Sequence, residues 1–411
     1  MKNGWKTKNL GDLCQVIGGG TPSKDKARYY SGDIPWATVR DMRSELITET
    51  ECKITKEAVK CSATNIIPSG NVVIATRVGL GKVCLLGQDT AINQDLRGIV
   101  PIDQKVLSVR FLFWWLKSTA NLIVAEGTGA TVQGVKLPFV KSLQAPVPPL
   151  PEQQRIVGIL DEAFDGIATA KANAEKNLQN ARALFESHLQ SVFTKRSPGW
   201  VEKRLGDVFD IGSSKRILET EWTSAGVPFY GGKEIVKLAK SGTVLSNSYI
   251  SEEKYRDYAS KYDMPRQDDI LITARGTIGV GYVVQEGDKF YYKDGNIISM
   301  RGKTPTNPHF MLYAFRSNAM ADQLGDLTGT TVRHLPIEKA KELVLRMPGF
   351  ATQNTVVEQI RKIEGETQRL ESIYQQKLAA LEALKKSLLH QAFSGQLTMD
   401  NGQRAMRKSV S

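Results

Sequence analysis

Two segments of the chain carry apolar or small residues at steps of three and four for about forty residues each. The first runs from Glu152 to Phe193 and the second from about Phe350 to Phe393, and neither contains a proline. This spacing places the apolar residues on one face of an α-helix. At about 1.5 Å per residue, each helix would be roughly 63 Å long. The pattern therefore predicts two long amphipathic helices.

The two helical patterns share their register. Subtracting 200 from the apolar positions of the second segment reproduces nearly every apolar position of the first. Each apolar stripe needs a helical partner that buries it. A homo-oligomeric coiled coil could supply that partner, but two stripes of equal register in one chain favour an intramolecular antiparallel pair. Prolines at Pro148–Pro151 and at Pro348 mark the two helix starts, because proline is tolerated in the first helical turn.

A different pattern precedes each long helix. Val72–Ala75 and Ile270–Thr273 are apolar runs bounded by glycine, proline, asparagine and serine, as is typical of buried strands. Val106–Ala125 and Pro308–Leu324 are predicted to be helical. Each half of the chain therefore opens with a mixed α and β domain.

The two halves also repeat each other in sequence. The offset between matching motifs drifts from 195 through 198 to 200, as expected when loops gain residues and the framework does not. The predicted class is α+β, with two similar domains separated by two long antiparallel paired helices in a pseudo-twofold repeat. The predicted segments are 1–150 (first domain), 151–195 (first helix), 196–348 (second domain) and 349–411 (second helix and tail). The matching motifs are Gly4-Trp5 with Gly199-Trp200, Leu10–Leu13 with Leu205–Val208, Asn71–Gly79 with Asp269–Gly279, and Gly127–Val132 with Leu327–Val332.

The charge balance favours a polyanionic partner. Among 411 residues, 55 are Lys or Arg and 43 are Asp or Glu, so the formal net charge is +12. Basic surface groups displace the counterions condensed on nucleic acid. The four cysteines and four histidines lack zinc-ligand spacing. We therefore expect a reduced cytoplasmic protein without a metal site. We also expect no membrane association, because no stretch approaches the roughly 18 apolar residues of a membrane span and the first residues lack the apolar core of a signal peptide.

Several motifs carry a resemblance to a known family. The less specific ones are the opening Trp5–Leu13, Gly32-Asp-Ile-Pro-Trp36 and Gly127-Thr-Gly-Ala-Thr131. The more specific ones are Pro148-Pro-Leu-Pro-Glu-Gln-Gln-Arg-Ile-Val157, at the start of the first helix, and Leu389-His-Gln-Ala-Phe-Ser-Gly-Gln-Leu397, at the end of the second. Over its whole length the chain resembles the specificity subunit of type I restriction–modification systems. The second helix start is degraded in sequence, although Gln353 still matches Gln153.

The resemblance implies a non-catalytic, DNA-binding subunit. Its two target-recognition domains would each bind one half of a bipartite double-stranded DNA target, and the paired helices would set the gap between the halves. Modification subunits, which use S-adenosylmethionine to methylate adenine, would dock on the helices. Restriction subunits would add ATP- and Mg²⁺-dependent cleavage. No cofactor is expected in this chain.

Two other classes of function remain open from the residues alone. Asp95, with Asp103 and Lys105, could form the carboxylate and lysine set of a Mg²⁺-dependent nuclease. A scaffold that uses the helices for protein assembly without binding DNA is the second alternative. Neither a phosphate-binding G-x-x-x-x-G-K-[ST] loop nor a complete dinucleotide fingerprint occurs in the sequence, which gives no support to an ATPase or an oxidoreductase.

Loops that carry hydrogen-bond donors supply the candidate DNA-binding residues, because arginine and lysine bind guanine or phosphate and amides bind adenine. The arginine after each buried strand recurs in both halves, which suits a phosphate contact more than base reading. Trp36 and the pair Phe229-Tyr230 are expected in the core. The candidates are Thr21, Ser23, Lys24, Arg40, Arg43, Arg77, Gln133 and Lys136 in the first domain, and Lys215, Arg216, Lys233, Arg275, Arg333 and His334 in the second.

Overall fold

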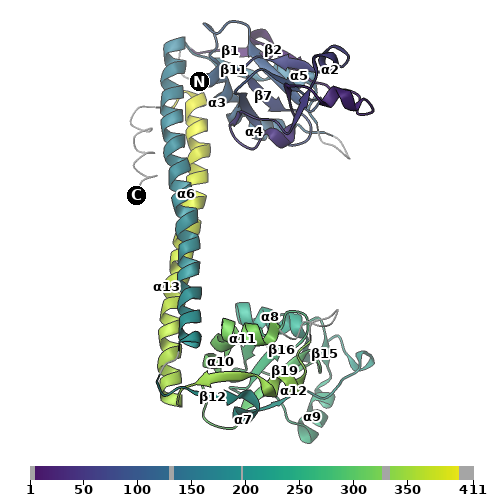
Figure 1. Cartoon of the computed structure of the whole chain (residues 1–411), viewed down its shortest axis with the longest axis vertical. Helices are drawn as coiled ribbons and strands as arrows, with labels where there is room; N and C mark the ends of the chain where they lie inside the picture. Colours follow the sequence, from purple (N-terminus) through teal and green to yellow (C-terminus); the bar gives the residue numbers. More distant parts are fainter. Residues whose placement is uncertain (1–4, 129–133, 196–197, 326–333, 398–411) are drawn as a thin grey trace. The chain divides into compact units, whose positions relative to one another are not determined.

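The computed structural model describes residues 5–128, 134–195, 198–325 and 334–397. The chain divides into two compact units. Unit 1 comprises Met1–Lys176 with Tyr374–Ser411, and unit 2 comprises Asn177–Ile373. Each unit contains one globular domain and a part of both long helices, α6 (Leu150–Thr194) and α13 (Phe350–Ser394) (Figure 1). The predicted α+β class, with two domains and two long helices, is confirmed.

Two sheets form the domain of unit 1. The central sheet has the strand order β2-β10-β7-β8-β4, and all four residues of β7 are buried, as the apolar run predicts. The second sheet has the order β5-β3-β9-β6, in which β3 and β9 are parallel. The strands are β2 (Cys14–Gly18), β3 (Ile34–Ala37), β4 (Leu46–Ile47), β5 (Cys52–Ile54), β6 (Asn65–Ile67), β7 (Val72–Ala75), β8 (Val83–Leu86), β9 (Thr90–Ile92) and β10 (Leu96–Pro101).

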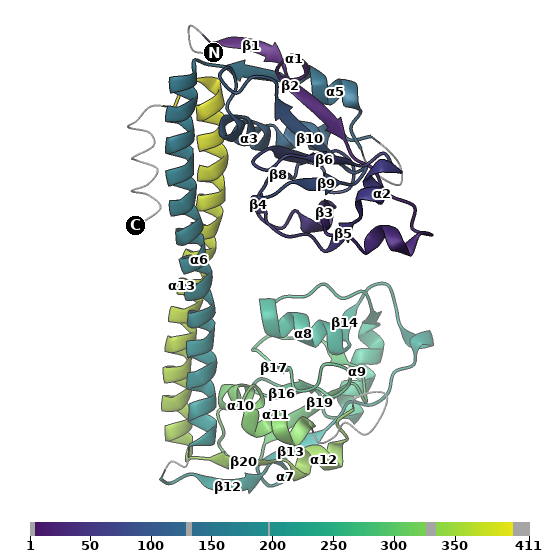
Figure 2. The same cartoon turned by 45° about the horizontal axis from the view of Figure 1, so that its top comes forward.

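Unit 2 repeats this topology with different additions. Its central sheet has the order β13-β19-β16-β17 (Figure 2). Its second sheet has the order β15-β14-β18, again with one parallel pair, β14 and β18. Two ten-residue helices, α8 (Gly232–Ser241) and α9 (Glu252–Lys261), accompany these sheets. The strands are β13 (Phe209–Gly212), β14 (Val227–Tyr230), β15 (Tyr249–Ile250), β16 (Ile270–Thr273), β17 (Gly281–Val283), β18 (Tyr291–Tyr292) and β19 (Ile297–Gly302).

A two-stranded ribbon closes each domain where its long helix begins. β1 (Lys6–Asn9) pairs antiparallel with β11 (Gln144–Val147), and β12 (Val201–Arg204) pairs in the same way with β20 (Val344–Met347). The first and last strands of a domain therefore meet beside the start of α6 or α13. The remaining short elements are α1 (Leu10–Leu13), η1 (Ala27–Tyr30), η2 (Val39–Asp41), α2 (Lys56–Lys60), α5 (Leu137–Ser142), α7 (Leu205–Val208), η3 (Glu219–Glu221) and α12 (Ile337–Glu342).

The helices predicted over 106–125 and 308–324 are each broken into two. The first consists of α3 (Val109–Ser118) and α4 (Ala120–Ala125), and the second of α10 (Pro308–Phe315) and α11 (Asn318–Gly325). A hydroxyl donates back into the preceding turn at each break, Thr119 to the Leu116 carbonyl and Ser317 to the Ala314 carbonyl. Such side-chain bonds compete with the helical backbone pattern and bend helices.

α3 is the centre of the unit 1 core. All residues from Phe111 to Leu116 are buried, because α3 packs on β7 and β8 and shares one apolar cluster with both long helices. A helix that is covered on several sides needs apolar residues all round. α10 occupies the corresponding place in unit 2, where Phe310 to Phe315 share a cluster with the other halves of the long helices.

The long helices pair antiparallel within each unit. In unit 1, residues near the start of α6, such as Ile156 and Leu160, share a core with Leu388 and Ala392 near the end of α13. In unit 2, Leu189 and Phe193 near the end of α6 share a core with Ile360 near the start of α13. No helix within the described residues is both long and apolar enough to cross a membrane.

In each domain a glycine lies just before a strand of the second sheet, Gly32 before β3 and Gly226 before β14. A Cβ atom on Gly32 would lie 2.2 Å from the Ile54 carbonyl oxygen, and one on Gly226 would lie 2.3 Å from that of Ile250. No side chain fits at such a distance. The Gly32–Trp36 motif is therefore explained by close strand packing, and Trp36, Phe229 and Tyr230 are buried as expected.

Candidate nucleic-acid interface

A buried glutamine joins each domain to its long helix. The Gln153 side chain accepts a hydrogen bond from the Ser108 backbone N–H (2.9 Å) and donates to the carbonyls of Val106 (2.8 Å) and Pro148 (2.9 Å). Gln353 accepts from the Asn307 backbone N–H (2.9 Å) and donates to the Pro348 carbonyl (2.9 Å). Both amides hold the N-terminus of the domain's core helix, α3 or α10, against the start of a long helix. The glutamine of the proline-to-helix motif is thus structural.

A carboxylate on each long helix adds a second connection. Asp161 on α6 accepts hydrogen bonds from Arg110 (2.5 Å) and from the Trp114 indole (2.7 Å), both on α3. Glu364 on α13 accepts from the Tyr313 hydroxyl (2.6 Å) and from Arg316 (2.8 Å), both on α10. Burial and the Glu364 bond raise the pKa of Tyr313 above its usual value. Each unit therefore uses one carboxylate, one aromatic donor and one arginine, although the positions differ.

The two most specific sequence motifs meet in unit 1. Arg155 donates two hydrogen bonds to Glu152 (2.7 and 2.9 Å) and one to the Leu397 carbonyl (3.0 Å). The bond to Glu152 raises the pKa of Arg155. At the degraded second helix start, Thr355 stands where the repeat would place an arginine. The sequence after α6 also lacks the Ser-Gly-Gln-Leu ending, so the two members of this contact are lost together.

The repeated arginines occupy the same corner in both domains. Arg77 follows β7. The residue between them, Thr76, donates its backbone N–H to the Asp95 carbonyl in the β9–β10 loop (2.8 Å). The Thr76 carbonyl accepts from the Val135 backbone N–H, in the segment after the Gly/Thr motif (2.9 Å). Arg275 follows β16, and Ala274 makes the equivalent bonds with Asn296 and Leu335, both 2.8 Å. In each domain, two segments that lie far apart in sequence therefore meet the repeated strand at this corner: the loop before β10 or β19 and the segment after the Gly/Thr motif.

Both corner arginines are available to a partner. The Arg77 side chain is 48% exposed and its Nε lies 3.7 Å from an Asp95 oxygen, which is a loose ion pair. Arg275 is exposed. Burial and the nearby charge of Arg77 lower the pKa of Arg97, so basic groups gather here in unit 1. An exposed arginine at a shared place in two domains suits a contact with phosphate, which every DNA sequence offers.

A concavity of about 740 Å³ lies in unit 1 beside this corner, and we call it the unit 1 concavity. Three predicted DNA-binding residues, Thr21, Lys24 and Arg40, line it together. Cys52 also lines it and is exposed. The full lining is Thr21, Lys24, Tyr30, Trp36, Thr38, Val39, Arg40, Asp41, Glu51, Cys52, Val78, Asn93, Gln94 and Asp95.

The other unit 1 candidates lie elsewhere. Ser23, Arg43 and Lys136 are exposed but do not line the concavity. Arg43 pairs with Glu51 and donates to the Arg40 carbonyl (3.0 Å), so it supports the rim. Ser23 makes a long bond to Asp25 (3.4 Å). Gln133 and the second-domain candidate Arg333 lie outside the described residues.

In unit 2 the candidates spread over three loops and one helix. Lys215 lies over the Tyr262 ring (5.6 Å), and the adjacent Arg216 pairs with Asp294 (2.9 Å). Lys233 is exposed in the first turn of α8. His334 contacts the Ala274 carbonyl (3.1 Å) next to Arg275. Sequence reasoning missed Gln94 and Asp294, because neither carries a motif and each is recognised only through its partner across the fold.

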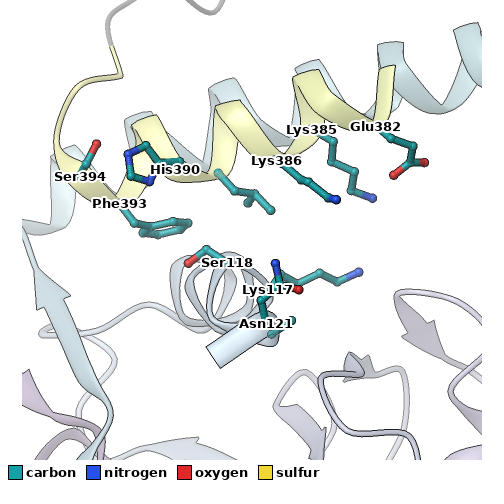
Figure 3. A pocket seen from close by; sticks show the side chains of 11 residues that line it. Lys117, Ser118, Asn121, Glu382, Lys385, Lys386, His390, Phe393 and Ser394 are labelled. Carbon is teal, nitrogen blue, oxygen red and sulfur yellow. The ribbon is translucent and has the colours of Figure 1, made fainter. Parts of the chain in front are cut away.

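A basic groove of about 570 Å³ runs between α13 and the α3–α4 turn of unit 1. Lys385, Lys386, His390 and Phe393 on α13 line it opposite Lys117, Ser118 and Asn121 (Figure 3). Burial and the charge of Lys117 lower the pKa of Lys385, which stacks over the Phe164 ring (4.9 Å). The groove therefore presents several lysines and one carboxylate, Glu382, beside the Phe393 ring.

The three residues of the nuclease alternative, Asp95, Asp103 and Lys105, lie at opposite ends of one strand. Asp95 directly precedes β10 and Asp103 follows it, so about 20 Å of extended strand separates them. Asp95 pairs with Arg77, and Asp103 accepts the Lys105 backbone N–H (2.8 Å) within a turn. Within the residues described, no group of three or more His, Cys, Asp or Glu is placed to hold a metal ion. The three residues do not form a common site.

Comparisons with known proteins agree with this picture. Residues 2–179 and 198–382 match the family model for the type I restriction modification DNA specificity domain. The type I restriction enzyme MjaIX specificity subunit of Methanocaldococcus jannaschii is 26% identical over 84% of this chain and 83% of its own length. The EcoR124I/EcoR124II specificity subunit of Escherichia coli is 36% identical over 40% of this chain and 42% of its own.

Solved structures share the fold at low sequence identity. The crystal structure of the HsdS subunit from Thermoanaerobacter tengcongensis is 19% identical, with a TM-score of 0.64 over 97% of this chain and 98% of that one. A chain from work on complex assembly and conformational transition of the type I R-M system is also 19% identical, with a TM-score of 0.76 over 97% of this chain and 99% of that one. The chain, matched twice by one domain model, belongs to the type I restriction–modification DNA specificity family.

Proposed function

We propose that this chain is the DNA-reading specificity subunit of a type I restriction–modification complex and that its two domains bind the two halves of a split target. The observation that carries the proposal is the duplication of domain and attachment. Each unit has the same order of core strands, and each attaches its domain through a buried glutamine at the start of a long helix. Two similar readers on antiparallel helices suit a target in two parts.

The long helices set the gap between the half-sites in this proposal. Each is a continuous helix of 45 residues, and their faces pair within both units. Adding seven residues, about two turns, to each helix at matching places should widen the gap and leave both half-sites unchanged. Unchanged spacing in the lengthened protein would contradict the ruler role.

Modification subunits dock on the helical part of the chain in this proposal. Leu184 on α6 and the pair Leu370 and Ile373 on α13 are exposed in unit 2 and offer apolar side chains that a docked subunit would cover. The basic groove of unit 1 offers a second, charged surface. Restriction subunits join through the assembled complex.

The chain itself is non-catalytic in this proposal, and S-adenosylmethionine, ATP and Mg²⁺ belong to its partners. Incubating the purified chain with plasmid DNA and Mg²⁺ tests this. We expect intact plasmid. Cleavage that persists without partners and disappears in the Asp103→Ala variant would restore the nuclease alternative.

Methylation mapping tests the central proposal. Cells that carry the modification subunit should methylate adenines at a two-part motif only when this chain is present. Footprinting of the purified complex should protect two short blocks of DNA around an unspecific gap. A single continuous block would contradict the split-target proposal. A scaffold would show little dependence of DNA binding on salt, whereas phosphate contacts give a log–log slope of about −0.9 for each phosphate neutralised.

Thiol labelling tests whether the unit 1 concavity faces the DNA. Cys52 lines the concavity, whereas Cys61 is also exposed but does not line it. Bound target duplex should slow modification of Cys52 more than that of Cys61. Burial raises the pKa of Cys14 to about 12 and of Cys84 to about 11, so these two thiols should stay unmodified in the folded protein. Equal reactivity of Cys52 with and without DNA would place the interface elsewhere.

A further inference from the structure

One contact is shared by the two units in position but not in chemistry. In unit 1, the Thr21 hydroxyl, after β2, donates to the Gln94 side-chain oxygen in the loop between β9 and β10. In unit 2, Arg216, after β13, donates from Nε to an Asp294 carboxylate oxygen (2.9 Å) in the loop between β18 and β19. A neutral hydroxyl–amide pair in one domain is an ion pair in the other.

Strand register shows that these positions are equivalent. Ile17 pairs with Gly98, the third residue of β10, and Gly212 pairs with Ser299, the third residue of β19. Thr21 and Arg216 each lie four residues beyond that point.

The loop partners match when each loop is counted from its first residue, although the unit 2 loop is one residue longer: three residues separate β9 from β10, and four separate β18 from β19. β9 ends at Ile92, opposite the last residue of β3, and β18 ends at Tyr292, opposite the last residue of β14. Gln94 and Asp294 each lie two residues beyond these strand ends.

The repeat distinguishes structural roles from recognition. Gln153 and Gln353 keep both position and chemistry because the same backbone groups must be bonded in each domain. Arg77 and Arg275 keep both because phosphate is common to all DNA. A pair that keeps its position but changes its chemistry is not required by the fold. The property that differs between the two halves of a split target is the base sequence.

The unit 1 pair has the groups that recognise adenine. The Gln94 oxygen accepts from Thr21 and retains a second lone pair, and no partner of its Nε2 is found among the described residues. An amide with one free donor and one free acceptor matches N7 and N6 of adenine in the major groove. Thr21 fixes the orientation of this amide, and both residues line the unit 1 concavity.

The unit 2 pair has the groups that recognise guanine. Asp294 engages Nε of Arg216, and the Arg216 side chain remains 74% exposed. A guanidinium held in this way has its terminal amino groups available for O6 and N7 of guanine, the most common specific contact in DNA recognition.

We propose that Thr21 and Gln94 read an adenine in one half-site, and that Arg216 and Asp294 read a guanine at the corresponding place in the other. The inference rests on the proposed function and assigns base-reading residues within it. Lys24 and Arg40 beside the unit 1 pair then contact phosphate or neighbouring bases.

Exchange of the pairs tests the inference in the full chain with its modification subunits. In the Thr21→Arg/Gln94→Asp variant, one adenine in the half-site bound by unit 1 should become guanine, while the other half-site and the gap stay the same. Arg216→Thr/Asp294→Gln should make the reciprocal change in the other half-site. Adenine-methylation mapping would record a preference of about 5- to 150-fold at one position.

Single substitutions and a matched control keep the test decisive. Gln94→Ala should relax one position of one half-site, and this variant decides the matter if the exchanged protein is inactive. The Arg28→Thr/Glu57→Gln control removes an exposed ion pair (2.9 Å) of the same domain, which does not line the concavity, and should leave the motif unchanged. If the wild-type chain directs a split motif and the exchange and Gln94→Ala variants direct the same motif, the assignment of these base-reading residues is refuted and the proposed function is not. A wild-type chain that directs no split motif would refute the proposed function.

Discussion

The two domains are most alike where they join the long helices and least alike at the sites we assign to base reading. Both use a buried glutamine and a carboxylate with an aromatic and an arginine donor at the helix junction. Farther from the junction, unit 1 has η2 and the edge strand β4, whereas unit 2 has α8. The shared attachment allows the recognition loops to differ without disturbing the frame.

Replacing the buried junction glutamine, Gln153 or Gln353, should have the largest effect on stability. Gln153→Ala loses three hydrogen bonds and leaves buried backbone groups unpaired, so we expect a loss of about 2–4 kcal/mol in the free energy of unfolding of unit 1. Gln353→Ala, with two such bonds, should lose less. Hydrogen exchange at the starts of α3 and α10, with denaturant titration, would measure both. The exposed neighbour Gln154→Ala is the control and should change stability by less than about 0.5 kcal/mol. Equally small losses of stability in all three variants would contradict the structural role of the two buried glutamines.

Removing the Tyr313 hydroxyl should have the next largest effect. Tyr313→Phe deletes one hydrogen bond to the Glu364 carboxylate and keeps the ring, so we expect a loss of about 1.5–3 kcal/mol in unit 2. Trp114→Phe also removes an indole donor to Asp161 in unit 1, but it leaves a cavity as well. In the Glu364→Gln background the Tyr313→Phe loss should shrink, and an unchanged loss would show that the hydroxyl acts through other contacts.

The corner arginines should act alike on DNA affinity. Arg77→Ala and Arg275→Ala should each weaken binding for all sequences and lower the magnitude of the log–log salt slope by about 0.9, with no change in the preferred bases. Binding isotherms at several salt concentrations would measure this, with Arg28→Ala as a control on the same domain. A change in motif at either position would instead assign these residues to base reading.

The smallest expected effect is a difference in acid sensitivity. Burial first, and then the charge of Arg361, lower the pKa of His309 on α10 below its usual value of 6.5. A depressed folded pKa means that the neutral form contributes stability above pH 6.5 and that this contribution is lost as the pH falls below it. At the corresponding place on α3, unit 1 has Arg110 instead of a histidine. Denaturation experiments between pH 5 and 7.5 should show that the stability of unit 2 falls less with decreasing pH in His309→Asn than in the wild type. Identical pH profiles of the two proteins would contradict this role of His309.

Much of the fold could be predicted because its signals are local. The period of the apolar residues predicts both long helices. The structure ends each one residue later, at Thr194 and Ser394, and begins α6 two residues earlier, at Leu150. β7 and β16 match their apolar runs. The helix breaks at Thr119 and Ser317 were not predicted, because the apolar pattern continues through them while one side-chain hydroxyl bond at each position interrupts the helix. The Gly32–Trp36 and Gln153 motifs were recognisable as motifs, but their structural roles were not.

The candidate site was predicted less completely than the fold. Thr21, Lys24 and Arg40 were identified from loop composition, and the structure brings them to one concavity. The assignment of all fourteen candidates to DNA remains a prediction. Gln94 was missed, since a single amide in a short loop has no sequence signature.

By itself, the sequence determined the duplication, the equal register of the two helices and the family, because each depends on residues close together in the chain or on a repeated order of motifs. Only the tertiary structure decided which residues share a surface. Thr21 and Gln94 are 73 residues apart, and Arg216 and Asp294 are 78 apart. Their contact depends on strand order in two sheets, and a pairing between distant loops leaves no period in the sequence.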